Sequence, residues 1–389
     1  MSGGTYQHGA QERVVFGAPC AKAVAEEAGR LGAERVFLMV SRSLNRETQV
    51  VAGVEQGLGG RYAGSFEGMP PHTPRDAVLA AAAQAREVRA DLLVTIGGGS
   101  LTDGGKIAQI ALRHDITEMD GLDDFRETLA ADGSRHGPQF EGPLVRQITV
   151  PTTLSGGEFN PHAGCTDPRR KMKEGYKHPE LVPRVVILDP AATIHTPEWL
   201  WLSTGVRAVD HAVETLCSER CNPYAEGTAR QALRLLSQGL PRCREQPDDL
   251  EARLNCQLGV WLSMEFSRHG IPLGASHAIG HILGGTCGVA HGHTSCVMMP
   301  HVLRYNAPAN AARQAAVSEA FGRPGRQAAD VVGEFISGLG MPRSLAEVGV
   351  EPAQFELIAK NTMHDHWIYT NPRPIEGPEA VMEILTLAA

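Results

Sequence analysis

The sequence lacks the long apolar runs, basic tracts and dense cysteines that mark several large protein classes. No stretch reaches the roughly 20 apolar residues that cross a bilayer, and the opening MSGGTYQHGAQER has no apolar signal core, so we expect neither membrane insertion nor export. With a net charge of −8 and no run of Lys and Arg, a nucleic-acid partner is not expected. Eight cysteines without a CxxC pair favour free thiols and a cytoplasmic location.

The two halves of the chain differ in their hydrophobic pattern, and 389 residues are enough for two cores. In the first half, short apolar runs alternate with helical stretches, which is typical of βαβ units and a mostly parallel, Rossmann-like sheet. The predicted strands are 35–41, 60–66, 91–99, 145–153 and 184–190. From Pro197 onward the periodicity is helical. We therefore predict an α/β domain over 1–191 and an all-α domain over 192–389, with the polar, acidic residues 115–143 as a surface excursion.

A glycine-rich turn follows the predicted strand 91–99 and opens a helix. Glycines let the backbone approach an anion, and the amino end of the helix presents N–H groups and a positive dipole. The residues that could cradle a dinucleotide pyrophosphate in this way are Gly97, Gly98, Gly99 and Ser100. An ordinary tight turn is the alternative. Thr152 and Thr153 follow another strand, and ligands of open α/β sheets bind at such carboxyl ends.

The end of the first predicted strand bears on the choice of nucleotide. An acidic residue there often bonds the ribose 2′-hydroxyl and repels a 2′-phosphate. This strand ends in Ser41 and Arg42 without a carboxylate, so we expect NADP(H) to be tolerated beside NAD(H), unless Arg42 is merely a solvated side chain. Asp103, in the first turn of the next helix, either contacts the cofactor or only balances the helix dipole.

Histidines are concentrated in two helical segments of the second half. Arg207 and His211 are four residues apart in TGVRAVDHAVE, and so are His277 and His281 in SHAIGHILGG, with His291 ten residues further on. Residues at i and i+4 share one helical face. Histidines at this spacing suit a metal centre or an active-site cluster.

The ordered motifs GGGS, PTT, TGVRAVDHAVE, SHAIGHILGG, AHG and TNPRPI resemble those of the iron-containing (group III) alcohol dehydrogenase superfamily over nearly the whole chain. The resemblance implies the dehydroquinate synthase-like fold, NAD(H) or NADP(H) as cofactor, a site in the cleft between the domains, and a homodimer. It implies that Lys173 contacts the cofactor ribose, and that one Asp and three His hold a metal. The matching histidines are His211, His277 and His291, and the Asp position corresponds to Arg207.

Arg207 is the main departure from that pattern. A guanidinium is a permanent cation without a lone pair to give, so we expect the affinity for Fe2+ or Zn2+ to fall sharply. Among the superfamily, this resembles the maleylacetate reductases, which carry a non-acidic residue there and are described as working without metal. TNPRPI and the HTP at 72–74 also resemble that branch, whereas the length of 115–143 is more like the alcohol dehydrogenases proper.

These observations lead to one predicted function and several alternatives. The resemblance implies an NAD(P)H-dependent reductase that adds hydride to the conjugated C=C of a small oxo-dicarboxylate and gives 3-oxoadipate. Arg207 would then bind a carboxylate or stabilise a developing enolate, and His281 would donate the proton or contact the substrate. The remaining predicted oxyanion donors or substrate ligands are His211, His277 and His291. The alternatives are an iron- or zinc-dependent alcohol dehydrogenase, a sugar-phosphate lyase of related fold, and a non-catalytic binding module.

Overall fold

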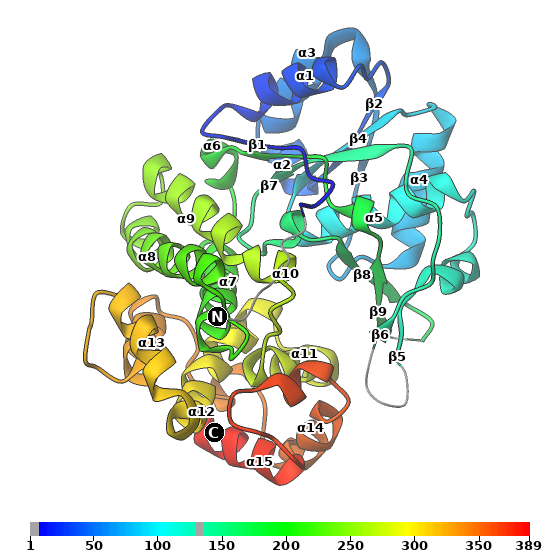
Figure 1. The fold of residues 1–389 in the computed structure, drawn as a ribbon. Helices are drawn as coiled ribbons and strands as arrows, with labels where there is room; N and C mark the ends of the chain where they lie inside the picture. Colours follow the sequence, from blue (N-terminus) through cyan, green and yellow to red (C-terminus); the bar gives the residue numbers. More distant parts are fainter. Residues whose placement is uncertain (1–7, 130–134, 171) are drawn as a thin grey trace. The chain divides into compact units, whose positions relative to one another are not determined.

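The computed structural model describes residues 8–129, 135–170 and 172–389. The chain divides into two compact units, His8–Thr196 and Pro197–Ala389 (Figure 1). The first is an α/β unit, and the described residues of the second unit form helices and no strands. The predicted class, a parallel-sheet α/β domain followed by an all-α domain, is confirmed. Within the described residues, no helix is both long and apolar enough to span a membrane.

A six-stranded, fully parallel sheet forms the centre of the first unit, in the order β1-β10-β7-β4-β2-β3. Its strands are β1 (Arg13–Phe16), β2 (Val36–Val40), β3 (Tyr62–Glu67), β4 (Leu92–Gly97), β7 (Arg146–Pro151) and β10 (Val185–Leu188). The helices of this unit are α1 (Cys20–Arg30), α2 (Arg42–Glu47), α3 (Val50–Leu58), α4 (Arg75–Glu87), α5 (Gly99–Arg113) and α6 (Pro190–Thr193). All five predicted strands are present, since buried parallel strands are continuous apolar runs that a sequence reveals.

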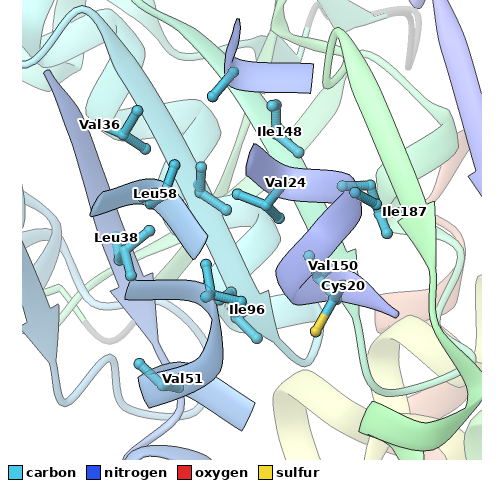
Figure 2. Packing of buried hydrophobic residues seen from close by; sticks show 14 of the residues in the cluster. Cys20, Val24, Val36, Leu38, Val51, Leu58, Ile96, Ile148, Val150 and Ile187 are labelled. Carbon is cyan, nitrogen blue, oxygen red and sulfur yellow. The ribbon is translucent and has the colours of Figure 1, made fainter. Parts of the chain in front are cut away.

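Both faces of the sheet are buried, and alternate residues of each strand serve different faces. Val36 and Leu38 of β2 belong to a cluster with Val24 of α1 and Val51 and Leu58 of α3 (Figure 2). The intervening Phe37 and Met39 pack with residues of α4 and α5 on the opposite face. The sheet is therefore packed on both faces, and this packing holds the carboxyl ends of β4 and β7 in place.

An antiparallel hairpin of β8 (His162–Asp167) and β9 (Met172–Lys177) lies outside the central sheet. The predicted surface excursion 115–143 holds the short helix η2 (Met119–Phe125) and the two-residue strands β5 (Thr128–Leu129) and β6 (Arg135–His136). This segment is more firmly attached than predicted, because Leu122 is fully buried.

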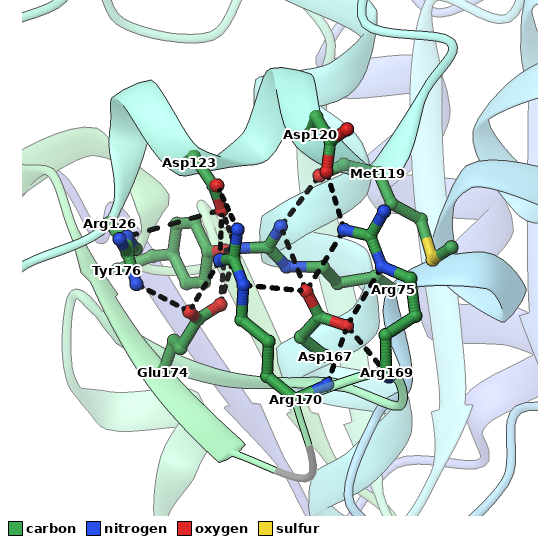
Figure 3. A network of polar contacts seen from close by, with 10 residues as sticks. All are labelled: Arg75, Met119, Asp120, Asp123, Arg126, Asp167, Arg169, Arg170, Glu174 and Tyr176. Carbon is green, nitrogen blue, oxygen red and sulfur yellow. Dashed lines mark hydrogen bonds and ion pairs between the residues drawn. The ribbon is translucent and has the colours of Figure 1, made fainter.

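A network of ion pairs, here called the Arg75 network, joins α4, η2 and the hairpin (Figure 3). Arg75 is fully buried, donates to Met119 O at 2.6 Å and to the Tyr176 hydroxyl at 2.9 Å, and pairs with Asp123 at 2.7 Å and with Glu174. The other members are Asp120, Arg126, Asp167, Arg169 and Arg170. Partners of this kind offset the cost of burying a guanidinium, and these contacts hold the three elements together as one block.

The second unit is built on long helices. They are α7 (Glu198–Cys217), α8 (Pro223–Glu245), α9 (Leu250–Ser263), α10 (Glu265–Arg268), α11 (Ala275–Cys287), α12 (His291–Ala320), α13 (Ala328–Gly338), α14 (Phe355–Thr362) and α15 (Pro378–Leu387), with the 3-10 helix η7 (His366–Thr370). One core cluster combines Leu283 of α11, Val297 of α12, Ile358 of α14 and Ile384 of α15. This packing holds the histidine-bearing helices α11 and α12 together, and α7 packs against α12 in the same unit.

Candidate active site

The predicted glycine turn lies at the junction of β4 and α5. Gly97 ends β4, Gly98 is the N-cap of α5, and Gly99 and Ser100 form its first turn. The amino-terminal N–H groups of a helix have no partner within the helix. Thr152 N–H donates to Gly97 O at 2.9 Å, so the PTT turn after β7 lies beside the glycine turn. The structure therefore brings the two turns together.

Space is tight at all three glycines, and Gly97 also has a backbone conformation that favours glycine. Gly97 has φ +152°, and a Cβ at this position would lie 2.4 Å from Leu101 Cδ1. A Cβ on Gly98 would lie 3.1 Å from Thr153 Cγ2, and one on Gly99 would lie 2.9 Å from Ser155 Oγ. Because side chains cannot occupy this corner, the exposed helix terminus suits a pyrophosphate.

Replacing Gly97 with alanine tests this corner. We expect G97A to weaken NADH and NADPH binding about tenfold, since backbone strain of roughly 1–3 kcal/mol and the clash with Leu101 displace the start of α5. Fluorescence titration of both nucleotides gives Kd, and a thermal melt reports folding. Gly60, with no atom within 4 Å of an added Cβ, supplies the matched control G60A. Unchanged nucleotide Kd in folded G97A would exclude the corner as the cofactor site.

Asp103 and Lys173 meet at the hairpin. Asp103 Oδ2 accepts the Gly164 N–H of β8 at 3.1 Å, so its carboxylate does more than balance a helix dipole. The side chain of Lys173 on β9 lies over Gly164, and a Cβ added to that glycine would lie 2.2 Å from Lys173 Cε. The two predicted cofactor residues thus share one neighbour, although the side chain of Lys173 is exposed.

The end of β2 has an acidic neighbour that the sequence did not reveal. Ser41 is the N-cap of α2, and its N–H donates to Ile96 O at 3.0 Å. Arg42 Nε lies 3.4 Å from Glu67 Oε1 at the end of the adjacent strand β3. Asn45 and Arg46 hold the pKa of Glu67 below its ordinary value. Arg42 is therefore paired rather than merely solvated, and a carboxylate is present beside Ser41's strand.

Two of the predicted histidines stack in the buried part of the second unit. The rings of His211 on α7 and His277 on α11 are 4.8 Å apart with 24° between their planes. His277 Nδ1 lies 2.7 Å from Glu214 Oε2, whereas His277 Nε2 and His211 Nδ1 are buried without a hydrogen-bond partner in the described structure. Burial and the charge of Arg207 lower the pKa of both histidines well below the ordinary value, so both are neutral near pH 7.

The other two histidines form a second, more exposed pair. The rings of His281 on α11 and His291 at the start of α12 are nearly parallel, with centroids 5.9 Å apart. Trp367 of η7 joins the pairs, because its ring lies 5.2 Å from that of His281 and 5.7 Å from that of His277. His281 Nδ1 is 2.9 Å from Asp365 Oδ2. Trp367, which the sequence did not single out, therefore links the two histidine pairs through His277 and His281.

Arg207 is a buried cation with little compensation. Its side chain donates one hydrogen bond, from Nη1 to Ser295 Oγ at 3.2 Å, and within the described chain it has no ion pair. Burial lowers the pKa of Arg207 to about 10, while the charges of Asp210 and Glu214 oppose the shift, so it stays charged near pH 7. A guanidinium has five N–H donors. The arrangement leaves donors available for an anionic ligand.

Asp210 and Glu214 are carboxylates on the same helix as Arg207. Asp210 is fully buried and accepts from the Ser276 hydroxyl at 2.7 Å. Glu214 accepts N–H bonds from Gly274 at 2.9 Å and from Ser276 at 3.0 Å, in addition to His277. Burial raises the pKa of both carboxyls, to about 6 for Asp210 and about 8 for Glu214, and mutual repulsion adds to the shift of Glu214. Glu214 thus fixes the start of α11 and the ring of His277.

The hydrogen bond to Glu214 also decides what His277 can do. A neutral imidazole that donates through Nδ1 has a lone pair on Nε2. Burial raises the pKa of Glu214 to about 8, so the direction of this hydrogen bond follows the protonation of Glu214. His277 Nε2 is buried without a hydrogen-bond partner in the described structure, and a role of His277 as oxyanion donor or substrate ligand stays a prediction.

The residues present do not fit the metal of the related enzymes. Among the residues that the structure describes, one set of three donor atoms comes within 4.8 Å of one another, from Asp210, Glu214 and His277, rather than from the predicted histidine trio. His277 Nδ1, both oxygens of Glu214 and Asp210 Oδ2 are already used in the hydrogen bonds above, whereas Asp210 Oδ1 has no hydrogen-bond partner in the described structure. In the position of the expected carboxylate ligand, Arg207 supplies a positive charge that repels a divalent ion.

Five residues of this region escaped sequence reasoning. They are Asp210, Glu214, Ser295, Asp365 and Trp367. Asp210 and Glu214 lie inside TGVRAVDHAVE, where their i, i+3 spacing from Arg207 and from His211 is a usable signal. Asp365 and Trp367 lie 84 and more residues from His281, where no local spacing can reveal contact.

Comparison with known proteins agrees with the motif order. The profile described as "Iron-containing alcohol dehydrogenase" matches residues 11–190, and "Fe-containing alcohol dehydrogenase family, C-terminal" matches residues 201–389. Dehydrogenase FUM7 of Gibberella moniliformis is 32% identical, over 97% of this chain and 96% of that protein. Maleylacetate reductase 1 of Cupriavidus pinatubonensis is 30% identical, over 94% and 92%. The crystal structure of maleylacetate reductase from Agrobacterium tumefaciens superposes with a TM-score of 0.83 at 30% identity, covering 100% and 98%.

Proposed function

Because the chain belongs to the iron-containing alcohol dehydrogenase family, we propose that it is an NAD(P)H-dependent reductase of a small conjugated oxo-dicarboxylic acid such as maleylacetate, and that it works without a metal. The resemblance to maleylacetate reductases over most of the chain supports the reaction type. One observation carries the substrate class, namely the buried, sparingly paired guanidinium of Arg207 where the family resemblance places a metal-binding carboxylate.

Arg207 is proposed to bind a substrate carboxylate. Its planar fork matches two carboxylate oxygens, and charge-assisted hydrogen bonds of this kind are roughly twice as strong as neutral ones. Because it is desolvated, water screens the attraction only weakly. Ser295 holds Nη1 in place, and Asp210 keeps the region from carrying a lone positive charge.

The corner formed by Gly97, Gly98 and Gly99 is proposed to hold the cofactor pyrophosphate, with Ser100, Thr152 and Thr153 beside it. Asp103 and Lys173 flank it through Gly164. When bound, reduced nicotinamide supplies the hydride. Because β2 carries no carboxylate, we propose that the protein accepts both NAD(H) and NADP(H). The pairing of Arg42 with Glu67 limits the contact of that arginine with a 2′-phosphate.

The proton that completes 3-oxoadipate is proposed to come from His281. Its side chain is 31% exposed, whereas His277 is fully buried. As the ketone oxygen gains enolate character, Arg207 stabilises the anionic substrate, and His281 delivers a proton to carbon. His211 and His277, which are both neutral and buried, are proposed to exclude water from the substrate. His291 stacks on His281 and restricts its ring.

A metal-dependent alcohol dehydrogenase is the second candidate. The observation that favours it is the buried His277 Nε2, which has no hydrogen-bond partner in the described structure and is an atom type that commonly binds a divalent ion. For this function Arg207 would have to move away from the ion.

Substrate reduction with and without metal tests the two candidates. Maleylacetate and a panel of aldehydes are each assayed by NADH and NADPH consumption, after chelation and again with added Fe2+ or Zn2+. We expect maleylacetate reduction that survives chelation, with less than a hundredfold difference between the nucleotides. Activity confined to aldehydes and restored only by metal would overturn the proposal in favour of the second candidate.

A further inference from the structure

The side chains of His281 and Asp365 form a hydrogen-bonded pair from segments far apart in the sequence. His281 Nδ1 lies 2.9 Å from Asp365 Oδ2, and the aspartate is 5% exposed whereas the histidine side chain is 31% exposed. We propose that Asp365 is the positioning residue that fixes the orientation and tautomer of His281 and thereby makes its Nε2 the proton donor. The inference rests on the proposed function, because that function assigns the proton transfer to His281.

The backbone holds Asp365 firmly. Its N–H donates to Thr362 O at 2.9 Å, and its Oδ1 accepts the Trp367 N–H at 3.0 Å as the N-cap of η7. One carboxylate oxygen is thus occupied by the cap, which leaves Oδ2 aimed at His281. Capping contacts of this kind restrict the side chain to one rotamer, so His281 meets an acceptor that is already in place.

Ring contacts restrict the imidazole from two sides. The Trp367 ring lies 5.2 Å from the His281 ring at 33°, and the His291 ring lies 5.9 Å away at 7°. A flip of the imidazole would exchange Nδ1 for a carbon opposite Asp365 and lose the hydrogen bond. Packing and hydrogen bonding therefore select the same orientation.

The chemistry follows from which nitrogen bears a proton. With Nδ1–H donated to the carboxylate, the second proton of the imidazolium resides on Nε2, and its transfer to substrate carbon leaves a neutral ring that still donates through Nδ1. Although burial raises it, the hydrogen bond from His281 holds the pKa of Asp365 below its ordinary value, so it remains a carboxylate. The negative charge stabilises the imidazolium that must exist before the transfer.

The neighbouring pair of His277 and Glu214 has the same hydrogen bond but a different setting. His277 is fully buried, and Glu214 also binds two backbone N–H groups. The pair of His281 and Asp365 is therefore the one whose ring can reach a ligand. This contrast separates a histidine that is held for structure from one that is held for proton transfer.

Kinetics of Asp365→Asn test the role. The asparagine keeps an oxygen for the Trp367 N–H, so folding should be retained, but its NH2 group faces His281 Nδ1 and removes the carboxylate charge. We expect kcat to fall about 100- to 1,000-fold, which is the usual contribution of general acid catalysis, with KM and nucleotide Kd changed less than about threefold. Asp249, the N-cap of α9, supplies the matched control D249N. Unchanged kcat in folded D365N would overturn the inference.

A substrate-free measurement separates this inference from the proposed function. In protein labelled with 15N-histidine, long-range 1H–15N spectra at about pH 8.5, where imidazoles are neutral, show which nitrogen bears the proton. His281→Gln identifies the signal. We expect the proton on Nδ1 in the wild type and on Nε2 in D365N. The same tautomer in both would overturn the positioning role, whereas a wild-type enzyme that reduces no oxo-acid would overturn the proposed function alone.

Discussion

Replacing Arg207 by glutamine should raise the KM for maleylacetate about a hundredfold and leave the reduction of a neutral enone nearly unchanged. Truncating one member of a desolvated charge pair costs about 2–5 kcal/mol, and the Arg207 side chain is both buried and sparingly paired. Steady-state kinetics on the two substrates measure the split. Arg207→Lys keeps the charge but loses the planar fork, so an intermediate increase of about tenfold is expected.

Arg207→Asp extends the test by reversing the charge. A carboxylate facing a substrate carboxylate is repulsive, so KM should rise further than in R207Q. Arg304, an exposed arginine of α12 that pairs with Asp330, gives the control R304Q. If R207D instead bound Fe2+ or Zn2+ by elemental analysis and kept the wild-type KM, Arg207 would only fill space, and its role as carboxylate anchor would be excluded.

Glu214→Leu should produce the largest loss of stability. Leucine leaves the Gly274 and Ser276 N–H groups and His277 Nδ1–H without the acceptor that Glu214 supplies. Each unsatisfied buried donor costs about 1–3 kcal/mol, so the free energy of unfolding should fall by roughly 4 kcal/mol and Tm by about 10 °C. Glu214→Gln, with one acceptor oxygen retained, should lie between the leucine variant and the wild type.

Thermal and urea unfolding check this expectation. The control is Glu226→Gln on α8, where the carboxylate is 45% exposed and bound only to arginine; exposed pairs contribute about 0–1 kcal/mol. A Tm of E214L within about 1 °C of that of E226Q would contradict the role of Glu214 in fixing α11.

The elements that the sequence predicts well are those with a local signal. The strands β2, β4, β7 and β10 are mostly apolar runs because both faces of the sheet are covered. The strand β1 escaped because it is a four-residue edge strand with exposed ends. The hairpin of β8 and β9 escaped because its residues are largely polar, and its burial depends on partners from α4 and η2.

The same distinction applies to the candidate site. Helical spacing of four residues placed Arg207 with His211 and His277 with His281, and the structure gathers these faces. The protonation and the hydrogen-bond partners of each group could not be predicted from the sequence. His277 is hydrogen-bonded to Glu214, and His281 is oriented by an aspartate 84 residues away. Such roles depend on contacts between distant segments, which a single sequence does not encode in any local pattern.

The Arg75 network has a consequence for engineering this scaffold by exchange of segments. Because Arg75 contacts Met119 and Asp123 on one side and Glu174 and Tyr176 on the other, the segment 115–143 is not an independent cassette. A chimaera that takes this segment from a relative would leave a buried positive charge without its partners. The relative's α4 and hairpin residues would have to be transferred together with the segment. Among family members, sequence changes in α4, in the segment 115–143 and in the hairpin are therefore expected to occur together, although the three stretches are separate in the gene.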